Sequence, residues 1–218
     1  MAATELSATT TARRHAHAGG LAVMIARVYA LLWVVTLAAA AATASLGLTD
    51  AVRGLLRLSL SGDTTPGPSP RVFAVVALHN LPVCGWPLLL PAAGAYRSRR
   101  CKFAATGLVA GAVTANAALV GAALGAYGTR LLPYVPQLPL EWLALAGGAA
   151  GWAAQRSASD RRARTLAAGV VVAAVLAAAA LESYAVPHGR DAHPAAPRVN
   201  PQGGQHRRRT DKYMQGHG

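Results

Sequence analysis

Four polar side chains stand inside otherwise apolar segments of this sequence. His79 and Asn80 interrupt one segment, Glu141 opens another, and Glu182 lies near the end of the last. A carboxylate at the centre of a membrane span costs about 2.5–3.5 kcal/mol on insertion scales, so such groups usually face other helices and pair. Two interpretations follow. The residues form a polar pocket that binds a cation, a proton or a lipid headgroup, or they form interhelical hydrogen bonds that fix packing, which is the interpretation we favour.

Other kinds of chemistry have little support in the residue pattern. The sequence contains no carboxylate pair, nucleophile–base arrangement or phosphate-binding loop, and its glycine-rich run at 147–151 lies within an apolar segment with no strand before it. No Cys or His spacing resembles a zinc site. Cys84 lies in an apolar run and Cys101 in a basic loop, which argues against a disulfide framework. We therefore predict a protein that is not an enzyme and that uses no catalytic residue, cofactor or metal ion.

The elements that position the four polar residues are predicted to be membrane-spanning helices. The chain has 218 residues, of which 53% are hydrophobic and only 13% are charged, which favours a membrane protein over a soluble domain. The net charge of +13 could indicate nucleic-acid binding, but the Lys and Arg residues fall in short clusters between apolar runs, as topogenic signals do. We expect an all-α, polytopic membrane helix bundle whose partner is the lipid bilayer and not nucleic acid.

The apolar segments predict five transmembrane helices, at about 21–48, 71–95, 103–127, 139–155 and 165–186. The first segment is longer than the core of a signal peptide, which is about 7–15 residues, so we interpret it as an uncleaved span. Prolines in the second segment predict kinks there; they are Pro82, Pro87 and Pro91.

Three further segments flank or connect these spans. Residues 50–60 place apolar side chains on one helical face and two arginines on another, which predicts a short interfacial helix. Residues 1–20 and 187–218 lack apolar periodicity, so we expect a disordered cytoplasmic tail and a disordered extracytoplasmic tail.

The basic clusters predict the orientation of the bundle. They occur before the first span, between the second and third, and between the fourth and fifth, which places all three on one side of a five-span protein. The positive-inside rule assigns that side to the cytoplasm, so the N-terminus is inside. His79, Asn80, Glu141 and Glu182 then all approach the outer leaflet.

The third predicted span contains a packing motif. Gly107, Gly111, Gly121 and Gly125 form two Gly-x-x-x-Gly pairs, which allow neighbouring helices to approach closely. Asn116 lies near the centre of the same span, where we expect it to make a packing hydrogen bond.

From the second span onward, the order of features resembles the stage II sporulation protein M family of integral membrane proteins. The resemblance covers roughly residues 71–186, and its matching positions are Asn80, the basic turn at 97–102, Gly121 and Gly125, Pro139-Leu140-Glu141, Ala146-Gly147 to Gly151, and Ala180-Leu181-Glu182. It implies a non-enzymatic scaffold in a bacterial cell membrane. Sporulation members of the family anchor peptidoglycan-remodelling partners at a septum, so it also implies a membrane or cell-envelope protein partner, with a homo-oligomer as another possibility.

Two functions remain open at this point. A partner-recruiting scaffold should bury its polar groups between helices and leave no continuous cavity. A transport component, either a permease subunit working with a separate ATPase or a small secondary carrier, should have a water-reachable pocket containing Glu141 and Glu182. The small number of intramembrane charges favours the scaffold.

Overall fold

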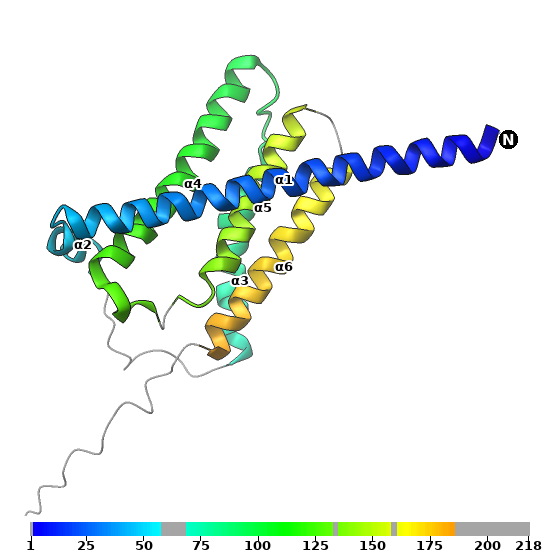
Figure 1. The fold of residues 1–218 in the computed structure, drawn as a ribbon. Helices are drawn as coiled ribbons and strands as arrows, with labels where there is room; N and C mark the ends of the chain where they lie inside the picture. The colour runs from blue at the N-terminus through cyan, green and yellow to red at the C-terminus, as the bar shows by residue number, and fades with distance from the viewer. Residues whose placement is uncertain (1, 58–68, 133–134, 158–160, 186–218) are drawn as a thin grey trace, which may run out of the picture.

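The computed structural model describes residues 2–57, 69–132, 135–157 and 161–185, and Figure 1 shows that these ranges are built from helices. The prediction of an all-α bundle is confirmed for this part of the chain. The helices, in chain order, are α1 (Ala2–Ser45), α2 (Thr49–Leu56), α3 (Pro70–Gly85), the short 3-10 helix η2 (Trp86–Leu89), α4 (Arg99–Tyr127), the 3-10 helix η3 (Gly128–Arg130), α5 (Leu138–Ser157) and α6 (Arg161–Ala185). The predicted tail at 187–218 lies outside the described residues.

Within the described ranges, four helical stretches are long and apolar enough to cross a membrane, as expected of a membrane protein. They are Gly19–Ser45, Pro70–Leu89, Arg99–Arg130 and Arg161–Tyr184, and they correspond to four of the five predicted spans. The remaining prediction, 139–155, does form a helix, α5, but this helix is not among the four. Glu141, two tryptophans and Gln155 reduce its hydropathy.

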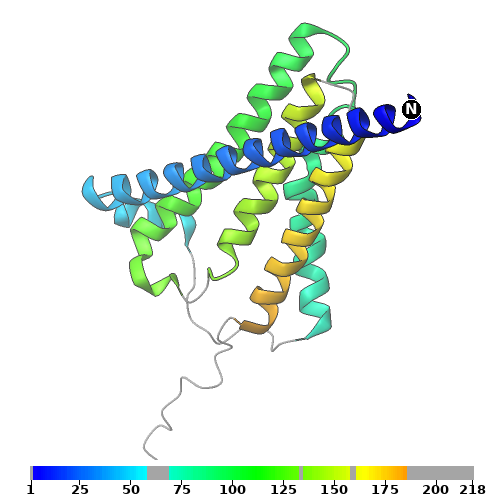
Figure 2. The ribbon, with the colours of Figure 1, turned by 45° about the vertical axis from the view of Figure 1, so that its right-hand side comes forward.

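Helix α5 occupies the centre of the bundle. It packs against α1, α3, α4 and α6, and its side chains are buried almost continuously from Trp142 to Trp152. The N-termini of α4 and α6 lie towards one end of the bundle, and the N-termini of α3 and α5 lie towards the other (Figures 1 and 2). Helix α5 therefore runs parallel to α3 and antiparallel to α4 and α6, which brings the start of α5 and the end of α6 together.

The first helix crosses this group obliquely, lying over α4 and α5 in both views (Figures 1 and 2). Its apolar part, Gly19–Ser45, contains 27 residues and is about 40 Å long. A helix of this length exceeds the bilayer core of about 30 Å, and tilting is the usual way to accommodate the difference.

Two helix boundaries differ from the prediction. We expected a disordered tail at 1–20, but α1 begins at Ala2, so most of that segment is helical. Its alanines, Glu5 and Leu6 have high helix propensity, and the long span that follows removes the cost of starting a helix. The second span also ends earlier than the predicted 71–95. Pro82 is accommodated inside α3. At Trp86 the chain changes to 3-10 geometry, because Pro87 has no N–H to donate.

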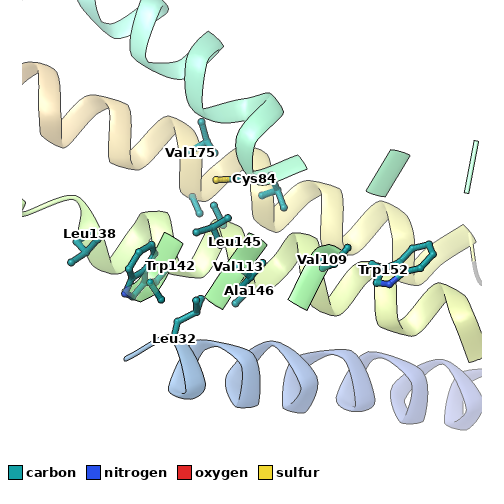
Figure 3. Packing of buried hydrophobic residues seen from close by; sticks show 14 of the residues in the cluster. Leu32, Cys84, Val109, Val113, Leu138, Trp142, Leu145, Ala146, Trp152 and Val175 are labelled. Carbon is teal, nitrogen blue, oxygen red and sulfur yellow. The ribbon is translucent and has the colours of Figure 1, made fainter. Parts of the chain in front are cut away.

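Small residues form the centre of the bundle, whereas large apolar residues cover its outside. Ala117, Ala144, Ala146 and Ala150 are fully buried, while many leucines and valines of α1, α3, α4 and α6 are exposed. Helices that associate in lipid gain little from burying leucine, since the lipid is equally apolar, and instead use small residues that allow close contact. Figure 3 shows the larger core residues at these contacts.

A short helix, α2, forms in the segment where an interfacial helix was predicted, and Arg53 attaches it to the bundle. The Arg53 Nε–H group donates to the Ala126 carbonyl at 2.9 Å, and its guanidinium lies 5.7 Å from the centre of the Tyr127 ring. Both partners are in the last turn of α4, where the unpaired carbonyls favour a cation. This contact gives Arg53 a structural role on the side opposite to the basic clusters.

Candidate functional site

The four polar residues predicted from the sequence line one pocket. Its volume is about 330 Å³, and its walls come from α3, α6 and the start of α5. Val75, Val76 and Gln137 complete a lining that contains His79, Asn80, Glu141 and Glu182. The structure therefore brings together side chains that lie more than a hundred positions apart in the sequence.

Local helix geometry determines which face of α3 reaches the pocket. Ser69 caps the helix by accepting a hydrogen bond from the Val72 N–H at 3.2 Å, and Pro70 occupies the first turn, where no N–H is needed. From that fixed start, Val75 and Val76 lie one turn before His79 and Asn80, on the same face.

The two carboxylates come from opposite ends of antiparallel helices. Glu141 lies in the first turn of α5, where the free N–H groups of a helix favour negative charge. Glu182 lies in the last turn of α6. Helices α5 and α6 run in opposite directions side by side (Figure 2), and the two residues line the same pocket at one end of the bundle.

The two carboxylates of the pocket are hydrogen-bond acceptors that no described residue uses. Glu141, Glu182 and Asn80 are half-buried, and His79 is exposed. Among the described residues, neither carboxylate has a hydrogen bond or a salt bridge within 4.0 Å, although Glu182 interacts electrostatically with His79 and with Glu141. The expected hydrogen bonds between these polar residues are thus not formed in this part of the structure. The arrangement suits a ligand group that carries positive charge and several N–H donors.

Further into the bundle, beyond the floor of the pocket, the helices are in close contact. On α5 the residues from Ala144 to Gly148 are all buried, and on α6 Val175 is 2% exposed. A Cβ atom on Gly148 would collide with the backbone carbonyl of Cys84 in α3. The pocket is therefore a recess at one end of the bundle, closed beneath by packed side chains and backbone.

Among the described residues, only the second of the two predicted glycine pairs packs against another helix. A Cβ atom on Gly121 would lie 2.9 Å from Ala39 Cβ, and one on Gly125 would lie 2.9 Å from Thr43 Cβ, so α1 sits directly on this pair. A Cβ atom on Gly107 or Gly111 would meet nothing within 4 Å in the described structure. The predicted packing residue Asn116 is half-buried on the same helix.

The sequence did not predict Gln137 as a contributor to the site, nor the packing partners of Gly148 and Gly151. Gln137 lies four residues before Glu141, a spacing of about one helical turn that could have identified it as a neighbour. Gly148 and Gly151 belong to the glycine-rich run, which gave no sign of its partners. A Cβ atom on Gly151 would lie 2.6 Å from Ala167 Cβ in α6.

The described residues contain no group of three or more His, Cys, Asp or Glu side chains placed to hold a metal ion. The pocket chemistry that they do provide is a pair of carboxylates flanked by amides and an imidazole. Comparison with protein-family models, curated proteins and solved structures finds no match for this chain.

Proposed function

We propose that this protein is a non-enzymatic integral membrane protein of the bacterial cell membrane, acting as a scaffold that recruits a cell-envelope partner. One observation carries the proposal: a polar recess with two carboxylates lies at the end of a bundle that is close-packed beneath it. Such a recess can receive a lysine or arginine side chain from a partner, because a charge pair in a half-buried site is strong and specific. A second copy of this chain is one such partner.

The proposal includes five spans with the N-terminus in the cytoplasm. Helix α5 has 20 residues and is about 30 Å long, which matches the thickness of the bilayer core. Its neighbours shield it from lipid, so a lower hydropathy is sufficient for it to cross. The short motifs that resemble the stage II sporulation protein M family support the same arrangement and the scaffold role.

The orientation can be tested with the native cysteines. Cys101 is exposed at the start of α4, beside the basic cluster, whereas Cys84 is buried. We expect a membrane-impermeant maleimide to leave intact cells unlabelled and to label Cys101 in inside-out vesicles. A Cys101→Ser variant should remove the signal from the inside-out vesicles. Labelling of intact cells at Cys101 would show that the proposed orientation is inverted.

The pocket can be tested with the double variant Glu141→Gln and Glu182→Gln. We expect recovery of the partner from native membranes after cross-linking to fall at least about tenfold, because removing one member of a partly buried charge pair costs several kcal/mol. Thermal stability in detergent should stay close to that of the parent, since neither carboxylate has a hydrogen bond within the described structure.

Asp50→Asn is the matched control, because Asp50 is an acidic residue on α2 whose side chain is 98% exposed and lies outside the pocket. It should recover the partner normally. Equal recovery with the double variant and the parent would contradict a recruiting role for the pocket.

Transport is the second candidate, because the pocket contains both Glu141 and Glu182, as a transport component requires. Transport would require the packed contacts of α5 with α3 and α6, which close the floor of the pocket, to open during each transport cycle. Co-purification separates the two candidates, since a permease subunit should recover an ATPase. For a carrier, proteoliposomes should show cation flux that the double variant abolishes.

A further inference from the structure

A second cavity lies between α3 with η2 on one side and the first half of α6 on the other. Its volume is about 680 Å³, twice that of the polar pocket, and the proposed function makes no use of it. Its lining is apolar apart from Arg164 and Thr165, and includes Leu81, Gly85, Leu89 and Val172.

The cavity is a groove on the outer surface of the bundle. Leu78, Leu89 and Val172 are exposed, so the groove is open along its length to whatever surrounds the bundle. Gly85 leaves room at its floor, because a Cβ atom there would come no closer than 4.0 Å to its nearest neighbour, Val171 Cγ1. From Arg164 to Val172 the groove extends eight residues along α6, or about 12 Å.

Positive charge is concentrated at one end of this groove. Arg164 lines the groove itself, is exposed, and has no acidic partner within the described structure. Arg161 is on the preceding turn, and the start of α4 with Arg99 and Arg100 lies at the same end of the bundle (Figure 1). The candidate membrane span begins at Arg161, and the ends of a span are where lipid headgroups are expected.

We propose that this groove binds one acidic phospholipid, with an acyl chain along the apolar walls and the phosphate on Arg164. Charge complementarity selects the occupant, because basic pockets between helices at a membrane surface hold anionic headgroups. The Arg164 guanidinium can donate two parallel hydrogen bonds to a phosphate. The apolar length below it accommodates part of one chain. This inference does not depend on the scaffold proposal, because none of its residues lines the polar pocket.

The test measures lipid retention by the full-length protein in a neutral detergent. Phosphatidylglycerol and phosphatidylcholine with identical acyl chains are added separately, and bound lipid is counted by native mass spectrometry. We expect one phosphatidylglycerol per chain to be retained about fivefold better than phosphatidylcholine, and Arg164→Gln to remove that preference. Arg161→Gln deletes the same charge from the same helix end, outside the groove. This variant should keep most of the preference for phosphatidylglycerol.

A second pair of variants tests the apolar part of the groove. Ala168 lines the groove, so Ala168→Leu should fill it and reduce retention of both lipids. Ala173→Leu adds the same side chain at an exposed position of α6 that does not line the groove, and should have no effect. Three results would each overturn the inference: equal retention of the two lipids by the parent, equal losses in Arg161→Gln and Arg164→Gln, or unchanged retention in Ala168→Leu.

Discussion

Replacing Gly148 by leucine is expected to disrupt the packing of the whole bundle, with a loss of stability of about 3 kcal/mol or more. Gly148 lies on the central helix α5, at the point where it crosses α3. Even the first atom of a new side chain would meet the Cys84 carbonyl, and the Pro87 ring would lie 3.6 Å away. Backbone cannot rotate away as a flexible side chain can, so α3 and α5 must separate. Thermal unfolding in detergent, followed by circular dichroism, measures the loss.

The chain supplies a matched control for this change. Gly111→Leu introduces the same side chain at a glycine in the middle of another helix, α4, where nothing in the described structure lies within 4 Å of the added Cβ. We expect its unfolding temperature to equal or exceed that of the parent, because leucine is a better helix former than glycine. If Gly148→Leu unfolded at the same temperature as Gly111→Leu, the α3–α5 contact described above would be wrong.

Truncating Trp142 to alanine is expected to have the second-largest effect, a loss of about 3 kcal/mol. The Trp142 side chain is 1% exposed, and it lies between α5 and α1, with Leu32 and Leu138 beside it (Figure 3). In lipid the transfer of apolar surface contributes little, but the void left by an indole ring still removes its packing contacts. For this reason we take the lower end of the range measured for such truncations.

Phe103→Ala provides the comparison for Trp142→Ala. Phe103 is also a large aromatic residue, but it is 82% exposed on α4. Its removal should change the unfolding temperature by no more than a degree or so, while Trp142→Ala should lower it by several degrees. Because Trp142 directly follows Glu141, its loss should also weaken partner recovery through the pocket. Equal effects of the two truncations would show that Trp142 is not in the core of the bundle.

The sequence by itself determined which segments become apolar helices. Insertion into a membrane depends on the composition of each segment, so the stretches around 21–48, 71–95, 103–127 and 165–186 could be found one at a time. Segment composition also explains why the predictions for α5 and for residues 2–20 were less successful. Helix α5 has a marginal composition because its environment is protein, and the segment at 2–20 is helical although nothing apolar marks it.

Only the tertiary structure decided which residues meet. Gly107 and Gly111 have the same spacing as Gly121 and Gly125, yet α1 packs on the second pair alone. The four polar residues were found in the sequence because charge is rare in apolar segments, but their common pocket, and the place of Gln137 in it, depend on how α3, α5 and α6 are turned towards one another. Helix rotation and crossing are set by the sum of many contacts between distant segments, and no single segment encodes them.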